Sequence, residues 1–284
     1  MLSILIPTYN FSCIELVRSL QQQVELAKIE YEIIVADDAS TCFVTENSAI
    51  NNLKNSRFIQ QKRNIGRANI RNFLADEAKF NYLLFIDGDA QVFLDKFIDN
   101  YIQLCKPNCC VVGGVAYREN INKELSLRAK YGQKREEKKH YFSAFNLLID
   151  KQVFLQVKFD KNLYHYGYED FLFGIEVEKI TSIKYIDNKL IHKGLDKNII
   201  FLDKTEKAIE NLWYLYSSKP EIQEKSQLLH TFFILKKWHL SGFIATFFCI
   251  LKPIIKANLI SKRPSLTLFS FYKIGLLCSR SKKK

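Results

Sequence analysis

The stretch Tyr82–Asp89, YLLFIDGD, decides the fold because an apolar run leads directly into two carboxylates. A short, continuous apolar run is typical of a strand that is buried on both faces within a parallel sheet. Ligands of open parallel sheets bind outside the carboxyl ends of the strands. The stretch therefore predicts a central parallel strand, with Asp87 and Asp89 at the edge where a binding site is expected.

Strand and helix patterns alternate around this stretch, over residues 1–115. Apolar runs predict further strands at Ser3–Pro7, Tyr31–Ala36, Arg57–Gln60 and Cys109–Val115. Helical spacing of apolar residues predicts helices at Ser12–Val24 (with Ser12 as the N-cap), Arg67–Lys79 and Leu94–Leu104. This alternation predicts an α/β fold, with a Rossmann-like, mostly parallel sheet flanked by helices.

The pattern changes beyond residue 115. Residues 117–140 are dense in charge and predict a long, mobile surface excursion. Strands are expected again in Tyr141–Ile149 and Ile183–Ile191, and helices in Gly167–Lys179, Phe201–Leu215 and the segment after residue 224. We expect Pro253 and Pro264 to break the helices of that last segment.

The net charge of +12 comes entirely from the last part of the chain. From Lys225 onward there are twelve Lys and Arg and no Asp or Glu, which leaves thirty basic and thirty acidic residues before it. A neutral body argues against nucleic-acid binding. The seven cysteines lack CxxC spacing and favour free thiols in a reducing compartment. The start, MLSILIPTYN, has no signal-peptide pattern, so we expect a cytoplasmic protein.

Two carboxylates one residue apart at a strand end suit a hard divalent cation, which needs only one or two carboxylates when water and substrate phosphates complete its shell. Gly88 between them would let a phosphate approach the backbone. The alternative for Asp87-Gly88-Asp89 is a solvated turn. No G-x-G-x-x-G follows the first strand and no G-x-x-x-x-G-K-[ST] occurs, which disfavours nicotinamide Rossmann proteins and P-loop NTPases.

Two further places carry candidate chemistry. Glu169 and Asp170 open a helical segment, where they are either N-terminal capping residues or a general base that takes a proton from a hydroxyl. His192 follows an apolar strand and is either a structural hydrogen-bond donor or a metal or phosphate contact beside Asp89. Aromatic residues around Glu169 provide either flat surfaces for sugar stacking or core packing: Tyr164, His165, Tyr166 and Tyr168.

These motifs, in this order, resemble glycosyltransferase family 2, whose fold is of the GT-A type. The resemblance covers residues 1 to about 195. It rests on five elements: SILIPTYN (3–10), EIIVADDAS (32–40, with Ala39 where glycine is usual), Asn64-Ile65-Gly66 followed by Arg71-Asn72, the D-x-D of residues 87–89, and the later E-D of residues 167–170. The resemblance implies a GT-A domain at 1–224, with a nucleotide-binding half of about 1–115 and an acceptor half of about 116–200.

The resemblance also implies roles by position. Asp170 would be the catalytic base, supported by Glu169, and Asp89 would bind Mn²⁺ or Mg²⁺, with His192 as a second metal contact. Residues implied in donor binding are Pro7, Tyr9, Asp37, Asp38, Arg71, Asp87 and Asn146. The implied reaction is an inverting transfer of a sugar from a nucleotide-diphosphate donor, with a UDP-sugar favoured, to a glycan or lipid-linked acceptor, in bacterial surface polysaccharide synthesis.

Two other functions remain open on the sequence. One is a nucleotide-sugar-binding protein without turnover, although Asp87, Asp89 and Asp170 are all present. The other is a nucleotidyltransferase, which would carry a glycine-rich loop after its first strand, where this chain has Pro7-Thr8-Tyr9-Asn10.

Residues 225–284 form a basic, apolar tail that we expect to be helical. The fourteen uncharged residues between Lys237 and Lys252 would make a helix of about 21 Å, short of the ~30 Å hydrocarbon core of a bilayer. A spanning helix is therefore disfavoured, and in-plane helices on an anionic inner membrane surface are favoured. The alternative is an appendage that packs on the main domain.

Overall fold

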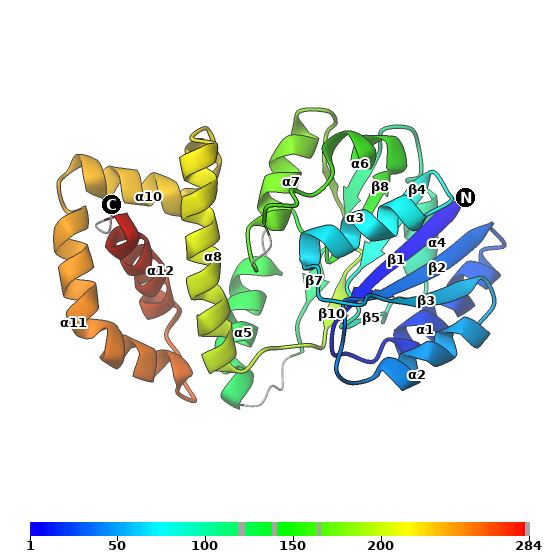
Figure 1. Cartoon of the computed structure of the whole chain (residues 1–284), viewed down its shortest axis with the longest axis horizontal. Helices are drawn as coiled ribbons and strands as arrows, with labels where there is room; N and C mark the ends of the chain where they lie inside the picture. Colours follow the sequence, from blue (N-terminus) through cyan, green and yellow to red (C-terminus); the bar gives the residue numbers. More distant parts are fainter. Residues whose placement is uncertain (119–122, 138–140, 164–165, 282–284) are drawn as a thin grey trace. The chain divides into compact units, whose positions relative to one another are not determined.

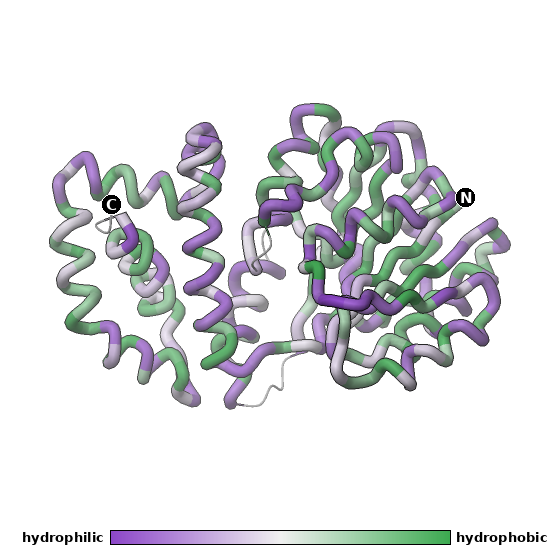
Figure 2. The backbone as a smooth tube through the Cα atoms, viewed as in Figure 1, coloured by the Kyte–Doolittle hydropathy of each residue, from purple (hydrophilic) through white to green (hydrophobic). Residues whose placement is uncertain are grey.

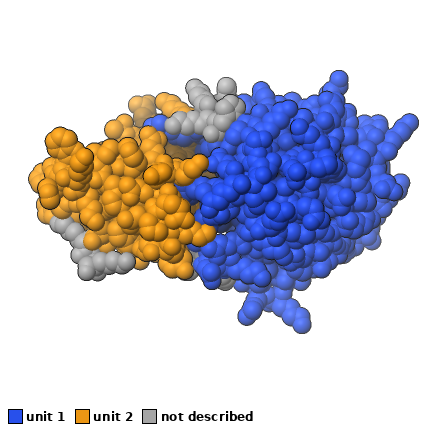
Figure 3. Space-filling view, turned by 90° about the horizontal axis from the view of Figure 1, so that it is seen from above, with its two compact units in different colours: residues 1–118, 135–164, 169–194 blue, residues 119–134, 165–168, 195–284 orange. Residues whose placement is uncertain are grey.

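The computed structural model of the chain describes residues 1–118, 123–137, 141–163 and 166–281. Tyr164 and His165, two of the aromatic residues named around Glu169, lie outside the described residues. The chain forms two compact units, which Figure 3 colours separately. Unit 1 comprises residues 1–118, 135–164 and 169–194, and unit 2 comprises residues 119–134, 165–168 and 195–284.

Unit 1 is built on a seven-stranded sheet with the order β3-β2-β1-β4-β8-β6-β9 (Figure 1). Its strands are β1 (Leu2–Thr8), β2 (Tyr31–Asp37), β3 (Ser56–Gln60), β4 (Tyr82–Ile86), β6 (Cys110–Val112), β8 (Asn146–Asp150) and β9 (Lys184–Tyr185). β1, β2, β3 and β4 run parallel, as do β6 and β9. β8 runs antiparallel to both β4 and β6, so the expected sheet is mostly rather than wholly parallel.

A second, three-stranded sheet lies in the same unit and has the order β5-β10-β7. It consists of β5 (Ala90–Gln91), β7 (Val115–Ala116) and β10 (Leu190–His192). β5 follows the Asp87–Asp89 turn directly, and its Ala90 pairs with His192 of β10. This sheet therefore ties the turn after β4 to a segment much later in the chain.

Helices cover both faces of the large sheet in unit 1 (Figure 1). They are α1 (Ile14–Leu26), α2 (Val44–Ser48), α3 (Arg67–Glu77), α4 (Phe97–Ile102), α6 (Lys151–Val157) and α7 (Glu169–Glu178), with a 3-10 turn, η1, at Ala49–Asn52. Alternation along the strands divides the core: Leu5, Ile34 and Phe85 pack toward α3, α6 and α7, whereas their sequence neighbours face α1 and α4. The strands expected from the apolar runs are all present.

The start of α1 differs from the prediction. The residue that precedes the helix is Cys13, without a side-chain cap, and the Ser12 hydroxyl instead donates to Glu46. The Cys13 amide donates to Asn47 Oδ1 at 2.8 Å. A side chain from α2 therefore satisfies a free amide of α1, which local sequence could not reveal.

Unit 2 is helical. It contains η2 (Lys123–Leu125), α5 (Ser126–Tyr131), α8 (Asn198–Ser218), α9 (Ile222–Lys225), α10 (Gln227–Lys237), α11 (Ser241–Ile260) and α12 (Leu266–Ser281). Its core gathers aromatic side chains from α8, α11 and α12 around Leu127 of α5. Because α8 belongs to this unit, residues 195–218 group with the C-terminal helices, and the expected domain boundary after residue 224 stays a prediction.

Two expectations for this part of the chain are wrong. The described residues of the segment 117–140 are largely helical: α5 is followed by a π-helical turn, η3, at Gly132–Glu136, and Leu127 and Ala129 are buried. α11 also runs straight through Pro253. Because proline has no backbone N–H, the helix lacks the hydrogen bond to the Cys249 carbonyl at this point. Packing of α11 on α12 stabilises the helix instead. A break does occur at Pro264, between α11 and α12.

By length and composition, α11 could cross a bilayer. It has 20 residues, and an 18-residue stretch of it has a mean hydropathy of 1.7, of which 22% is buried in the structure. The uninterrupted helix is thus longer than the fourteen-residue segment expected from the sequence. Length alone does not distinguish a spanning helix from one that lies in a membrane surface.

Candidate active site

The turn after β2 holds Asp37 and Asp38 in place through backbone amides. Asp37 Oδ1 accepts from the Ser40 amide at 2.9 Å, while its Oδ2 is buried with no hydrogen-bond partner among the described residues. Asp38 accepts from the amides of Ile65 and Gly66, at 2.7 and 3.0 Å. Burial raises the pKa of Asp38, and these two amides partly offset that effect.

Ala39, which follows this pair, has a φ of +60°. That left-handed conformation suits glycine, because the Cβ of other residues crowds the backbone there. The structure thus gives a physical reason for the glycine that is usual at this position.

The turn after β4 is packed tightly against the first strand. Gly88 donates its amide to the Pro7 carbonyl at 3.0 Å. A Cβ on Gly88 would lie 2.8 Å from Cys13 Sγ and 2.9 Å from Thr8 Oγ1. The glycine is therefore required by contacts within the protein, a reason different from the expected approach of a phosphate.

Arg71 of α3 joins the two acidic motifs. Its guanidinium, which is 1% exposed, donates to Asp87 Oδ1 at 2.7 Å and approaches Asp170 Oδ1 at 3.4 Å. Burial works against the charge, but Asp87 and Asp170 outweigh it and hold the pKa of Arg71 above its usual value. Both terminal amino groups are engaged inside the protein, and the implied contact of Arg71 with the donor stays a prediction.

Asp170, at the start of α7, has a partner on each carboxylate oxygen. Besides Arg71 on Oδ1, its Oδ2 accepts from the Ala144 amide at 3.0 Å and the Ser143 hydroxyl at 3.3 Å. Glu169 beside it is buried, and burial, followed by the charge of Asp170, raises the pKa of Glu169. The neighbouring carboxylates are therefore in different surroundings: Asp170 is about one quarter exposed, and Glu169 is enclosed.

Asp89 and His192 come together through the pairing of β5 with β10. His192 Nε2 lies 3.7 Å from Asp89 Oδ2, and the imidazole is stacked between the rings of Phe145 and Tyr117, with centroids 5.2 and 5.8 Å away. Gly194 lies so close that a Cβ would meet Asp89 Oδ2 at 2.2 Å. A carboxylate and an imidazole oriented by packing are ligand types that Mn²⁺ accepts, with phosphate oxygens as the remaining ligands.

The remaining residues of the implied site differ in their surroundings. Tyr9 is exposed, and Pro7 lies at the end of β1. Asn146 is 1% exposed and both polar atoms of its side chain are hydrogen-bonded: Oδ1 accepts from the Tyr101 hydroxyl at 2.7 Å, and Nδ2 donates to the carbonyls of Asn188 and Gly114. Its implied contact with the donor sugar stays a prediction.

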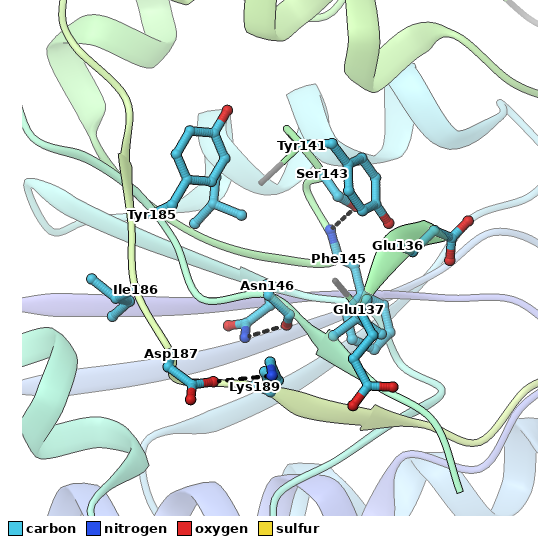
Figure 4. Close-up of a pocket in the computed structure, with 13 residues that line it drawn as sticks. Glu136, Glu137, Tyr141, Ser143, Phe145, Asn146, Tyr185, Ile186, Asp187 and Lys189 are labelled. Carbon is cyan, nitrogen blue, oxygen red and sulfur yellow. Dashed lines mark hydrogen bonds and ion pairs between the residues drawn. The ribbon is translucent and has the colours of Figure 1, made fainter. Parts of the chain in front are cut away.

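A pocket of about 290 Å³ opens at the same edge of the sheet (Figure 4). Tyr185, Ile186 and Asp187 follow one another along one side of it, and Tyr141, Glu136 and Glu137 lie on the other (Figure 4). Ser143, whose hydroxyl contacts Asp170, and Phe145, which stacks on His192, also line it. Sequence reasoning missed these lining residues, because no motif marks them.

Comparison with known proteins gives a family and a fold. The family model described as "Glycosyl transferase family 2" matches residues 3–161, more than half of the chain. No match is found among curated proteins.

Solved structures resemble the whole chain at low identity. A mannosyltransferase from Pyrobaculum calidifontis, PcManGT, solved with GDP-Man and Mn²⁺, matches with a TM-score of 0.61 and 13% identity, covering 99% of this chain and 86% of that one. Residues 1–349 of S. aureus TarS match with a TM-score of 0.52 and 16% identity, covering 100% and 92%. These likenesses confirm the expected GT-A type α/β fold.

Proposed function

Because the chain belongs to glycosyl transferase family 2, we propose that it moves a sugar, with inversion, from a nucleotide-diphosphate donor to a hydroxyl of a glycan or lipid-linked acceptor. A UDP-sugar is the favoured donor, and assembly of a bacterial surface polysaccharide is the proposed setting. The observation that carries this proposal is the Arg71 bridge between Asp87 and Asp170, which joins the D-x-D turn to the candidate base at one edge of the sheet.

Asp89 and His192 are proposed to hold Mn²⁺ or Mg²⁺. Their side chains lie within 3.7 Å of each other and offer the oxygen and nitrogen ligands that such ions accept. When bound, the cation would neutralise charge on the diphosphate leaving group. Support for a divalent metal also comes from PcManGT, which was solved with Mn²⁺. Asp37 and Asp38 are proposed to bind the base and ribose of the donor, with Tyr9 and Pro7 beside them.

Asp170 is proposed as the base that accepts the proton of the acceptor hydroxyl. The acceptor oxygen forms a bond to the anomeric carbon while the bond from that carbon to the diphosphate breaks, so a single displacement inverts the centre. The pocket beside Ser143 provides a place for the acceptor within reach of this carboxylate. Arg71 is proposed to orient Asp170 through their ion pair, as a positioning residue.

The test is a comparison of Asp89→Ala with the full chain of unaltered sequence. We expect Asp89→Ala to abolish metal-dependent turnover of UDP-sugars, while circular dichroism and the melting temperature change little. Asp95→Ala, which removes an exposed carboxylate nearby, is the matched control and should keep full activity. Retained turnover in Asp89→Ala would refute the assignment.

A thermal-shift screen defines the donor class. UDP, GDP and thymidine diphosphate are each added with and without Mn²⁺, and a ligand that binds only the folded chain raises the melting temperature. We expect UDP with Mn²⁺ to give the largest shift. Binding of a nucleotide sugar with no transfer or hydrolysis under any condition would favour a binding protein, and pyrophosphate release from a nucleoside triphosphate would favour a nucleotidyltransferase.

A further inference from the structure

α11 exposes an apolar face along its whole length. Phe243, Phe247, Ile250 and Ile254 are between 46% and 70% exposed and recur at helical spacing. Thr246, Pro253 and Ala257 continue the same exposed face, which we call the outer face of α11. No charged residue interrupts it. In Figure 2 the helix is predominantly green, the colour of hydrophobic residues.

The opposite face of α11 is already occupied inside unit 2. Phe248 packs so closely on α12 that a Cβ on Gly275 would lie 2.4 Å from its ring, and it also meets Tyr272 edge-on at 5.5 Å. Lys252 pairs with Glu206 of α8 at 3.2 Å. The helix is therefore apolar on both faces. The inner face is packed within its unit, whereas the outer face stays largely exposed and makes an edge-on ring contact from Phe247 to Phe271 of α12 at 6.4 Å.

Basic residues stand at both ends of the outer face. Lys236 and Lys237 end α10 just before α11, and Lys262 and Arg263 follow α11, all four of them exposed. Trp238, which is 71% exposed, lies between the first pair and the helix. An apolar stripe with an aromatic residue and basic pairs at its ends matches a lipid interface, where the stripe enters the acyl region and the cations contact phosphates.

We propose that the outer face of α11 docks, parallel to the membrane plane, on the surface of an anionic bilayer. Spanning is disfavoured because it would strip Phe248 from α12 and carry the Lys252–Glu206 pair into hydrocarbon. Self-association through this face is disfavoured because a two-fold contact would bring the basic pairs of both copies together, with no acidic residue from Lys225 onward to offset them. The proposal rests on unit 2 alone and does not depend on the proposed function.

The first test measures binding of the full chain to vesicles by flotation. Phosphatidylcholine vesicles are compared with vesicles that also contain phosphatidylglycerol, and we expect strong binding only to the latter. The double variant Phe247→Glu/Ile250→Glu should bind at least ten-fold more weakly, because each buried side chain of this size is worth about a ten-fold change or more. The matched control is Leu26→Glu/Ile180→Glu, which adds the same charges at exposed apolar sites of unit 1 and should bind normally.

The second test measures how much the basic residues contribute to vesicle binding. Lys236→Glu/Lys237→Glu should weaken binding to anionic vesicles by about five-fold or more for each charge and remove most of its salt dependence. Brominated lipids should quench Trp238 when the bromine is near the headgroups and only weakly when it is near the bilayer centre.

Three results would overturn the proposal. One is equal flotation of the Phe247→Glu/Ile250→Glu variant and the full chain. Another is membrane-bound protein that resists extraction with alkaline carbonate, which would indicate a spanning helix. The third is a dimer in solution that this variant abolishes, in a chain that binds no vesicles. Sugar-nucleotide hydrolysis in solution is measured in parallel, so loss of docking and loss of catalysis are distinguished.

Discussion

Arg71 shows how one side chain can determine the electrostatics of a site without facing solvent. It pairs with Asp87 and Asp170, which belong to motifs far apart in the sequence. A buried cation between two carboxylates compensates their charge, and its removal would leave both carboxylates without that partner. The sequence marks Arg71 as part of a motif, but only the fold reveals which carboxylates it joins.

Ala39 provides a prediction about stability. Its φ of +60° costs free energy that glycine would not incur. We expect Ala39→Gly to raise the free energy of unfolding by about 0.5–1 kcal/mol, since the relief of strain exceeds the added entropy of the unfolded chain. Urea unfolding measures the change. Ala257→Gly, at an exposed position within α11, should instead lower stability by about 1 kcal/mol, and a loss of stability in Ala39→Gly would contradict the assigned conformation.

Gly194 provides a prediction about activity. A Cβ there would lie 2.2 Å from Asp89 Oδ2 and 2.7 Å from Asp89 Cβ, so the carboxylate must move. We expect Gly194→Ala to weaken Mn²⁺ activation and lower turnover about ten- to one-hundred-fold, as loss of an outer-shell constraint does at metal sites. Activity as a function of Mn²⁺ concentration measures this. Gly242→Ala, in α11, should leave the activation curve unchanged; an unchanged curve in Gly194→Ala would exclude Asp89 as the ligand.

At the scale of elements, α5 replaces the expected surface excursion, and this can be tested. Leu127 of α5 is fully buried and packs in the aromatic core of unit 2. We expect Leu127→Ala to lower the free energy of unfolding by about 2–5 kcal/mol, because it leaves a cavity in that core. Lys134→Ala, at an exposed position of the π-helical turn, is the control and should change stability by less than about 0.5 kcal/mol. If the two variants had the same free energy of unfolding, Leu127 would not be part of the core, and the expectation of a surface segment would stand.

The elements that sequence predicted best are those whose pattern is local. The strands β1, β2 and β4 are continuous apolar runs, and hydrophobic periodicity locates such runs directly. The antiparallel direction of β8 and the cap of α1 by Asn47 depend on partners distant in sequence, so no local pattern encodes them. α5 was missed because it is short and charged, and its buried residues Leu127, Arg128 and Ala129 are consecutive, so they leave no helical spacing of apolar residues in the sequence.

The candidate site divides in the same way. Asp37, Asp87 and Asp89 stand at strand ends, where the topology of a parallel sheet places functional groups. The proximity of His192 to Asp89 needs the β5–β10 pair, which is too short to leave a signal in the sequence. The pocket residues Tyr141, Tyr185 and Asp187 come together only when β8 and β9 have paired with β6 in the sheet.

At the scale of the whole molecule, the seven cysteines are free, as expected, and differ in burial. Burial raises the pKa of Cys13 and of Cys110 to about 12 each. Since only the thiolate reacts rapidly, these two should resist iodoacetamide at pH 7.5, and a rise to pH 9 should change that little. Cys42 and Cys249 are exposed and should react first.

Mass spectrometry after timed alkylation measures these rates. In urea all seven cysteines should be labelled, which controls for reagent and detection. Rapid labelling of Cys13 in the folded protein would contradict its burial between α1 and the Gly88 turn.

The short sheet that joins β5 to β10 has a consequence for biosynthesis. The ribosome releases Asp89 long before β10, so a nascent chain can assemble β1 to β4 while the strand that bears His192 is still unmade. Contacts between residues so distant in sequence close late, after the local units have formed. A chain that stalls or is cleaved before Leu190 would therefore contain the candidate donor-binding residues of β1 to β4 but lack the strand that pairs with Ala90, beside Asp89. The contact between Asp89 and His192 therefore forms only after about two thirds of the chain has been made, while the helices from α8 onward are still to follow.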